Sequence, residues 1–336
     1  MSEPAVSVVI PTYQRRDSLA RALDALARQT LAPERYEVIV VIDGSTDGTR
    51  ELMESFAALC AVRALSQENR GRAAACNAGL RAARGALAVL LDDDMEPAPG
   101  CLAAHLAAHD GRPRLGVVGA VPVPVDPASP PVVDYVGTKF NRHLDTLSRP
   151  GHRFGLRDFY SGNFSIDRGT LLEVGGFDEA FTLYGNEDLE LSLRLARAGV
   201  TLMFSADACA VQRYTKSFAA LARDNEAKGR TAVQLASKHP EAFRDLKLSH
   251  WSEGSPRWRT LRAALLAATR FWPGTSGAVV HLVGRLERRR RARMHSYYHH
   301  ALDYFYWLGA RRALRENRRA GRGLTSLSEP AGAGGV

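Results

Sequence analysis

Three consecutive aspartates, Asp92, Asp93 and Asp94, follow the apolar run of residues 87–91. Neighbouring carboxylates repel one another, and a cation relieves that repulsion. Carboxylate oxygens are also the ligands of divalent metals that keep part of their water shell and bind substrate phosphates. The triplet therefore indicates either a metal and phosphate site or an acidic turn in solvent.

Two other acidic clusters have residue types suited to the same chemistry. Asp43 ends the apolar run 38–42, where it can accept a hydrogen bond from a nucleobase or ribose, or belong to a turn that caps a helix. Glu187 and Asp188 begin a predicted helix. A carboxylate there can take a proton from an attacking hydroxyl, or favour the helix N-terminus through the helix dipole. Each cluster alone leaves both interpretations open.

Alternating strand and helix patterns would bring these clusters together. The predicted strands are residues 6–10, 38–42, 62–65 and 87–91. Helical periodicity lies between them, in a segment that Asp17 can cap and in residues 70–84. The alternation predicts an α/β fold with a parallel sheet and helices on both faces. Ligands of such sheets bind beyond the carboxyl ends of the strands, where the acidic clusters stand.

A second set of elements follows a proline-rich stretch. Five prolines lie between residues 122 and 131, so we expect a long loop over roughly 122–158. Further predicted strands are residues 159–166, 202–204 and 209–211, and further predicted helices are residues 169–174, 187–198 and 217–237.

The motifs become specific in combination. Six motifs follow one another between residues 5 and 215, and their order resembles glycosyltransferase family 2. They are PTYQR, IDGSTDGT, NRG with CNAGL, LDDDM, VGGFDE and GNEDLELSLRL. The resemblance implies the GT-A fold, a Rossmann-like nucleotide-binding sheet. It also implies transfer of a sugar from a nucleotide-sugar donor to a hydroxyl acceptor with inversion of the anomeric centre, in polysaccharide, glycoconjugate or natural-product synthesis.

The resemblance also implies roles for individual residues. Asp188 matches the catalytic base, and Glu187 would orient the acceptor. Asp94 and Asp92 would hold a divalent metal, Mg²⁺ or Mn²⁺. Gly162 and Asn163 match a segment beside the donor sugar and acceptor. The implied donor-binding residues are Pro11, Thr12, Tyr13, Arg15, Asp43, Asn69, Gly71, Asp92 and Asp93.

The sequence departs from the family pattern at several positions. Cys76 stands where an arginine is usual, and Gln212 stands where many relatives have a metal-binding histidine. Arg213 or Lys216 would then share in neutralising charge. Arg70 and Arg72 could meet phosphate oxygens of the donor, but the favoured interpretation is that they are ordinary solvated helix arginines. A UDP- or dTDP-sugar is the favoured donor, because an aspartate such as Asp43 suits a pyrimidine.

Composition limits the class of protein. The chain has 336 residues, of which 45% are hydrophobic and 24% charged, as in a soluble globular protein. No apolar run reaches the length of a spanning helix, and no secretory leader is recognisable. The isolated cysteines indicate a reducing, cytoplasmic location. We expect a GT-A domain over 1–245, a basic helical extension over 246–319 and a disordered tail over 320–336.

The net charge of +9 is concentrated near the end of the chain, because residues 250–336 hold 16 arginines and five acidic residues. Six of these arginines lie in the run 285–293. Amphipathic segments with aromatic residues lie on either side of that run. The combination indicates either contact with an anionic membrane, on the inner face of the cell membrane, or a helical subdomain with a solvated basic face. No nucleic-acid-reading motif accompanies the charge, so we expect no nucleic-acid partner.

Three other functions remain as alternatives. A nucleotidyltransferase on a similar sheet would carry a glycine-rich basic loop after the first strand, where this chain has Pro11-Thr12-Tyr13. A catalytically silent scaffold of the same fold would have no need to keep Asp43, Asp94 and Asp188. A nucleic-acid-binding protein would show steeply salt-dependent binding to DNA or RNA.

Overall fold

A computed structural model describes residues 3–56, 60–289 and 294–327. Contacts between residues divide the chain into two compact units. The first comprises residues up to 125, 137–182 and 187–214, and the second comprises 126–136, 183–186 and 215 onward. The sequence-based domain boundary near residue 245 stays a prediction.

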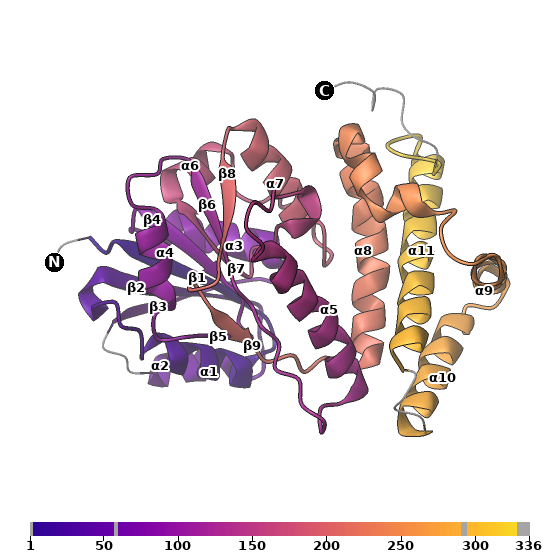
Figure 1. The fold of residues 1–336 in the computed structure, drawn as a ribbon, viewed down its shortest axis with the longest axis horizontal. Helices are drawn as coiled ribbons and strands as arrows, with labels where there is room; N and C mark the ends of the chain where they lie inside the picture. The colour runs from indigo at the N-terminus through magenta and orange to yellow at the C-terminus, as the bar shows by residue number, and fades with distance from the viewer. Residues whose placement is uncertain (1–2, 57–59, 290–293, 328–336) are drawn as a thin grey trace. The chain divides into compact units, whose positions relative to one another are not determined.

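A seven-stranded sheet forms the centre of the first unit (Figure 1). Its strands lie in the order β3 (Ala61–Gln67), β2 (Tyr36–Asp43), β1 (Val6–Thr12), β4 (Leu87–Leu91), β7 (Asn163–Asp167), β6 (Leu115–Gly119) and β8 (Thr201–Ser205). The strands β5 (Met95–Pro97) and β9 (Ala210–Gln212) form a separate antiparallel pair. The predicted α/β class is confirmed.

The sheet is mixed, which corrects the expectation of a parallel one. The strands β3, β2, β1 and β4 are parallel, but β7 runs antiparallel to both β4 and β6. The apolar runs show where strands occur, whereas their direction depends on the long connections between them. In the parallel half, Thr12 pairs with Ile42 and Val9 pairs with Leu90. The carboxyl ends of β1, β2 and β4 therefore meet at one edge of the sheet.

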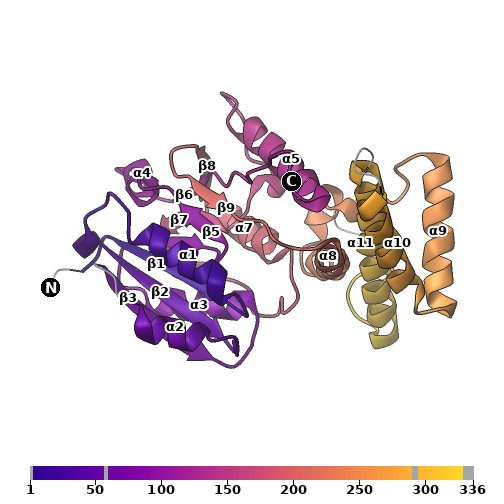
Figure 2. The same ribbon diagram turned by 90° about the horizontal axis from the view of Figure 1, so that it is seen from below.

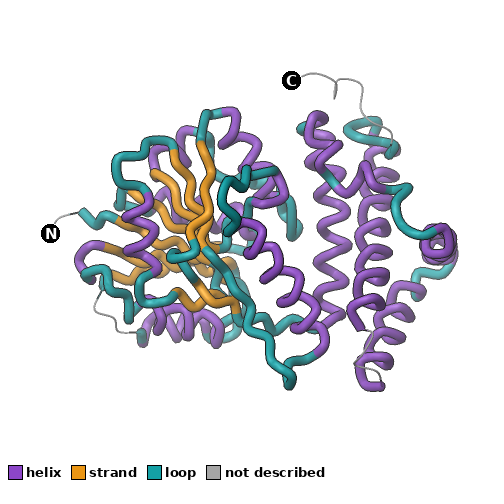
Figure 3. The backbone as a smooth tube through the Cα atoms, in the orientation of Figure 1, coloured by secondary structure: helices purple, strands orange, loops and turns teal. Residues whose placement is uncertain are grey.

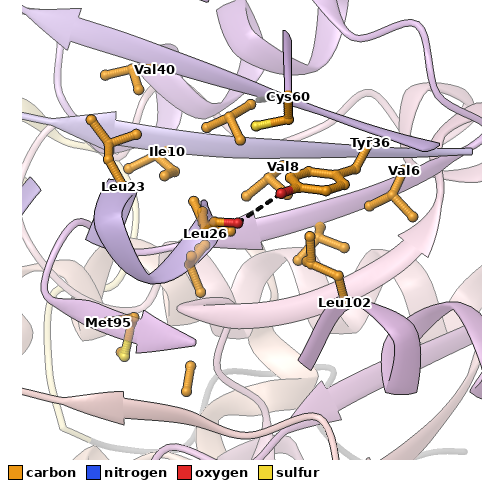
Figure 4. Close-up of a cluster of buried hydrophobic side chains, with 14 of the residues drawn as sticks. Val6, Val8, Ile10, Leu23, Leu26, Tyr36, Val40, Cys60, Met95 and Leu102 are labelled. Atoms are coloured by element: carbon orange, nitrogen blue, oxygen red, sulfur yellow. Dashed lines mark hydrogen bonds between the residues drawn. The ribbon is translucent and has the colours of Figure 1, made fainter. Parts of the chain in front are cut away.

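Alternate residues of the strands face two hydrophobic layers. On one face, Val6, Val8 and Ile10 of β1 pack with α1 (Arg16–Leu26) and α4 (Cys101–Ala108). Figure 4 shows this layer, in which the Tyr36 hydroxyl donates a hydrogen bond to the Leu26 carbonyl at 2.8 Å. The side of α2 (Thr49–Ser55) that carries Leu52 and Met53 covers the same face.

Three helices cover the other face of the sheet. The helices α3 (Arg72–Ala82), α6 (Arg168–Glu173) and α7 (Glu187–Arg197) contribute Leu80, Leu171 and Leu191 to a layer around Phe164. Figure 2 shows α1 and α3 on opposite sides of the strands. Helices therefore lie on both faces, as the sequence pattern predicts.

The expected loop over 122–158 is wrong for much of its length, because α5 spans Pro131–Leu147. The prolines indicated an irregular segment, but Pro131 is the first residue of the helix. A proline is tolerated there because the first backbone N–H of a helix has no partner inside the helix. The segment before Pro131 is irregular, as expected.

Helices form the second unit, and the tube in Figure 3 shows them in purple. Its long helices are α8 (Phe218–Lys238), α9 (Pro256–Phe271), α10 (Thr275–Arg289) and α11 (Met294–Ala320). The helices α8 and α11 approach closely at Gly229 and Gly309. A Cβ atom at Gly309 would collide with the Glu226 carbonyl oxygen, and one at Gly229 would collide with the Tyr306 carbonyl oxygen.

The aromatic residues of α11 belong to the core of this unit. Tyr298, Tyr304, Phe305 and Trp307 are buried, as the helical-subdomain alternative predicts for this segment. Membrane contact by the extension stays a prediction. Phe271 and Trp272, in contrast, are each 69% exposed. Part of the basic run 285–293 and most of the predicted disordered tail, namely 290–293 and 328–336, lie outside the described residues. No described helix combines the length and the hydrophobicity needed to cross a membrane.

Candidate active site

The carboxyl ends of β1 and β4 place Thr12 beside the aspartate triplet. Thr12 Oγ1 donates a hydrogen bond to Asp93 Oδ2 at 2.8 Å. Arg15 follows β1 and reaches the same triplet, with its Nη1 2.8 Å from Asp94 Oδ2 and 3.5 Å from Asp93 Oδ1. Burial raises the pKa of Asp93 to about 7, although Arg15 and the Thr12 hydroxyl act in the opposite direction. A single arginine thus compensates two neighbouring carboxylates.

Arg72, the first residue of α3, joins the triplet to the predicted base. Its Nη2 lies 2.8 Å from Asp92 Oδ1, and its Nη1 lies 3.3 Å from Asp188 Oδ1. Its Nη2 also donates to Ser161 Oγ at 2.9 Å. Burial opposes the charge of Arg72, but Asp92 and Asp188 are among the groups that raise its pKa well above the usual value.

The expectation that Arg72 is an ordinary solvated arginine is wrong, since only 22% of its side chain is exposed. The same expectation is correct for the side chain of Arg70, which is 61% exposed and pairs with Glu179. One signal could have found Arg72. It lies four residues before Cys76, one helical turn away on the same face of α3, and Cys76 occupies the position where the family usually has an arginine.

Asp188 lies at the start of α7 and uses one of its oxygens for support. Its Oδ1 accepts hydrogen bonds from Arg72 and from Ser161 Oγ. No described residue donates a hydrogen bond to Asp188 Oδ2, and 26% of the side chain is exposed. Ser161 was not among the residues predicted from the sequence, although it directly precedes Gly162. The arrangement leaves one carboxylate oxygen of Asp188 available to a ligand.

Glu187, the neighbour of Asp188, is 5% exposed, and its Oε2 has no hydrogen-bond partner among the described residues. Burial raises the pKa of Glu187, and the nearby charge of Asp188 adds to that shift, while Arg72 opposes it. A buried carboxyl oxygen without a partner is costly. A ligand hydroxyl that donates to it would remove that cost.

Asp43 closes the loop that leads into α3. Its Oδ1 accepts hydrogen bonds from Gln67 Nε2 at 2.7 Å and from the Arg70 backbone N–H at 2.9 Å. Its Oδ2 accepts from the Gly71 N–H at 2.9 Å. Asp43 is 3% exposed, so its first role is to order the loop around Gly71. Whether it also contacts a nucleobase stays a prediction.

Two predicted residues on the segment entering β7 differ in their surroundings. The Gly162 carbonyl accepts a hydrogen bond from Asp92 N–H at 2.9 Å, and a Cβ at Gly162 would lie 2.7 Å from Asp92 Oδ2. A larger residue at this position would therefore have to displace the Asp92 carboxylate. The side chain of Asn163 is buried, and it bonds to the carbonyls of Ala120 and Ala208 and to His105 Nε2. Asn163 thus holds the framework together.

The remaining predicted donor residues lie at the same edge of the sheet. Pro11 is part of β1, Tyr13 follows β1 and is 49% exposed, and Asn69 is exposed in the loop before α3. The donor-binding roles of these residues stay predictions.

The two carboxylates predicted to hold a metal face different arginines. Asp92 pairs with Arg72, and Asp94 pairs with Arg15. Within the described part of the chain, no group of three or more histidine, cysteine or acidic side chains is arranged to bind a metal. Gln212 Nε2, at the position of the expected histidine, lies 3.4 Å from both oxygens of Asp94. Arg213 pairs with Glu96 instead. The donor set fits a cation held by Asp94 and completed by substrate phosphates, rather than an all-protein site.

Comparisons with known proteins identify similar sequences. Residues 7–169 match the family model "Glycosyl transferase family 2", and residues 142–221 match "N-terminal domain of galactosyltransferase". The chain is 34% identical over 234 residues to validoxylamine A glucosyltransferase of Streptomyces hygroscopicus subsp. limoneus, which covers 62% of this chain and 51% of that protein. It is 28% identical over 228 residues to chondroitin synthase of Escherichia coli, which covers 58% of this chain and 32% of that protein. The chain spans about half the length of the first of these relatives.

Solved structures share the fold. The mannosyltransferase PcManGT from Pyrobaculum calidifontis, in complex with GDP-Man and Mn²⁺, superposes with a TM-score of 0.54 at 22% identity and covers 91% of this chain and 88% of its own. TarS 1–349 of S. aureus, in complex with UDP, gives a TM-score of 0.52 at 16% identity and covers 94% of this chain and 92% of its own. The predicted GT-A fold is confirmed.

Proposed function

This chain belongs to glycosyltransferase family 2 through its domain at residues 7–169, and from that premise we propose that it transfers a sugar from a nucleotide-sugar donor to a hydroxyl acceptor. One observation carries the proposal. The aspartate triplet after β4 and Asp188 at the start of α7 are distant in sequence, yet Arg72 contacts both Asp92 and Asp188. The aspartate triplet on the donor side of the site and the proposed base therefore contact the same guanidinium group.

Asp188 supplies the base of the proposed reaction. Its Oδ2 takes the proton of the acceptor hydroxyl while the hydroxyl oxygen forms a bond to the anomeric carbon. The bond from that carbon to the diphosphate oxygen breaks, and its electron pair leaves with the diphosphate. A single displacement of this kind inverts the anomeric centre. The unpartnered Oε2 of Glu187 would accept a hydrogen bond from the sugar or the acceptor and so fix its orientation.

Arg15 and Arg72 supply positive charge beside the proposed diphosphate position. Each is paired with an aspartate of the triplet, and a guanidinium can hold a carboxylate and a phosphate oxygen together through its several N–H donors. Asp94 and the Gln212 amide are the residues that would hold a divalent cation. Such a cation would neutralise charge on the departing diphosphate when bound.

Asp43 and the loop that it orders would receive the nucleotide. A pyrimidine donor, UDP or dTDP, stays the favoured choice, because a carboxylate can accept a hydrogen bond from a pyrimidine N–H. The complexes of the structural neighbours contain GDP-Man in one case and UDP in the other, so guanine donors belong in the test. The acceptor stays open among lipid-linked, glycan and natural-product hydroxyls.

The test has two measurements on three proteins. A thermal-shift screen of UDP-, dTDP- and GDP-sugars with Mn²⁺ identifies the donor, because a ligand that binds only the folded state raises the melting temperature. Hydrolysis of that donor is then compared for the wild type, Asp188→Asn and the surface control Asp207→Asn. We expect Asp188→Asn to bind the donor but to turn it over roughly 100-fold more slowly or worse, and Asp207→Asn to match the wild type.

Two results would contradict the proposal. If no nucleotide-sugar stabilises the wild-type protein, the chain does not bind such donors, and a silent scaffold of the same fold becomes the better interpretation. If Asp188→Asn hydrolyses the donor at the wild-type rate, Asp188 is not the base.

A further inference from the structure

A pocket in the second unit is lined by four arginines. Its volume is about 490 Å³, and its lining residues are Arg270 at the end of α9 and Arg315, Arg318 and Arg319 near the end of α11. No carboxylate of the described residues forms an ion pair with any of these four. The neighbouring acid Glu316 is paired with Arg230, and Glu226 is paired with Arg312. The pocket therefore concentrates positive charge without compensation from the described part of the chain.

Physical chemistry indicates what such a pocket binds. Arginines near a helix C-terminus are favoured by the helix dipole, which helps explain why they can gather at the ends of α9 and α11. Four guanidinium groups around one cavity still repel one another, and a bound anion removes that repulsion. Guanidinium groups bind phosphate through paired N–H donors. The field of these cations also extends along α11, since Arg315 is one of the groups that lower the pKa of the half-buried Arg311, after burial itself.

Two exposed aromatic residues directly follow one of the four arginines. Phe271 is the last residue of α9, Trp272 begins the connection to α10, and each is 69% exposed. The guanidinium carbon of Arg270 lies 5.9 Å from the centre of the Phe271 ring, so the aromatic pair stands beside the pocket. Two further exposed apolar residues, Leu261 and Leu282, belong to α9 and α10 themselves. Aromatic side chains beside arginines are typical of surfaces that enter the headgroup region of an anionic membrane.

We infer that the arginine pocket, defined by Arg270, Arg315, Arg318 and Arg319, binds the phosphate of an anionic phospholipid headgroup, with Phe271 and Trp272 entering the membrane interface beside it. The exposed aromatic pair favours the lipid source of the phosphate, because a free phosphate or a nucleic-acid backbone gives these side chains no apolar surroundings. This inference does not depend on the proposed sugar transfer, since it concerns the second unit alone.

Vesicle binding tests the inference directly. The full chain is sedimented at low salt with vesicles of phosphatidylcholine alone or of phosphatidylcholine mixed with phosphatidylglycerol. We expect recovery with the mixed vesicles only. Arg315→Gln/Arg319→Gln should weaken that binding by roughly 25-fold, about fivefold for each arginine removed from a membrane surface. The control Arg28→Gln/Arg50→Gln removes the same charge from exposed positions of the first unit and should bind as the wild type does.

The aromatic residues are tested separately. Phe271→Ala/Trp272→Ala should also weaken vesicle binding but should leave the binding of inorganic phosphate, measured by calorimetry, unchanged. Melting curves establish that each variant is folded. We expect all of them to fold, because the replaced side chains are exposed and contribute little to packing.

Several outcomes would overturn the inference. Equal recovery with neutral and mixed vesicles would show that the headgroup charge is irrelevant. An equal loss in the pocket variant and in the control variant would show that only net charge matters. Binding of inorganic phosphate that needs Arg315 and Arg319, without vesicle binding, would assign the pocket to a soluble phosphate. Steeply salt-dependent binding of duplex DNA, without vesicle binding, would assign it to nucleic acid.

Discussion

Nη1 of Arg72 lies 3.3 Å from Oδ1 of Asp188. The same guanidinium holds Asp92 through Nε and Nη2 at 3.0 and 2.8 Å, so one side chain fixes the predicted base relative to the donor side of the site. Without it, Asp92, Glu187 and Asp188 would face one another as uncompensated acids. Arg72 therefore acts as a positioning residue for Asp188.

Replacing Arg72 tests that role. Arg72→Met should lower kcat for the donor found by thermal shift by roughly 100-fold, because a displaced base loses its alignment with the acceptor. The kcat of Arg72→Lys should lie between that of Arg72→Met and that of the wild type, since one ammonium group cannot reach three partners in the fixed geometry of a guanidinium. Arg81→Met, on the same helix and 58% exposed, should leave kcat unchanged. A change in KM alone would contradict positioning of the base.

The pairing of Arg15 with Asp94 predicts competition with a metal. Arg15→Met should bind Mn²⁺ at least about fivefold more tightly in the absence of nucleotide, because roughly 1 kcal/mol of repulsion is removed from the cation. Titration followed by electron paramagnetic resonance measures the free Mn²⁺ directly. Arg16→Met is the matched control, since Arg16 is half exposed and pairs with Asp17. Equal affinity in all three proteins would show that Arg15 does not compete for Asp94.

Much of the first unit could be predicted from local pattern. Runs such as Val6–Ile10 and Leu87–Leu91 are short, apolar and rich in β-branched or leucine residues, and they form buried strands because both faces of the sheet are covered by helices. The acidic clusters at Asp43 and Asp92 could be placed at the carboxyl edge of the sheet, because each directly follows such an apolar run in the sequence. The helix at 131–147 was missed because a proline signals a break everywhere except at the first position of a helix.

The roles of Arg72 and Ser161 depended on distant contacts. Arg72 looks like a surface arginine in a segment of small residues, and only the approach of α7 and the segment before β7 gives it Asp188 and Ser161 as partners. In the same way, Asn163 matches a substrate-binding motif, but its side-chain amide donates hydrogen bonds to the carbonyl groups of Ala120 and Ala208. A linear motif records residue types and does not record which partners the fold brings to them.

The burial of Glu187 predicts a stability that depends on pH. Its pKa in the folded protein is raised above the reference value of 4.5, so the folded state keeps a proton that the unfolded state has released. This contribution is complete below pH 4.5 and is lost as the pH rises through the folded pKa. Glu187→Gln removes the titration. The melting temperature of Glu187→Gln minus that of the wild type should therefore increase from pH 5 to pH 8.

The expected increase is on the order of 1 kcal/mol for each unit of pKa shift, or a few degrees in melting temperature for a protein of this size. The measurement is made without ligand and with a chelator, so that no bound substrate or metal changes the charge of the site. The control Glu173→Gln removes an exposed carboxylate that pairs with Arg114. The difference in melting temperature between this variant and the wild type should be nearly the same at pH 5 and pH 8. A flat difference for Glu187→Gln would show that the carboxyl group is hydrated in solution.

The close approach of α8 and α11 predicts opposite effects of two glycine substitutions. Gly309→Ala places a Cβ against the Glu226 carbonyl oxygen and forces the helices apart, which should destabilise the second unit by about 2 kcal/mol or more. Gly284→Ala, on α10, meets nothing within 4 Å and should stabilise it by roughly 0.5–1 kcal/mol through better helix propensity. All four tryptophans, Trp251, Trp258, Trp272 and Trp307, belong to this unit, so tryptophan fluorescence during urea unfolding reports on it selectively. Equal shifts of the urea midpoint in both variants would contradict a tight glycine contact between α8 and α11.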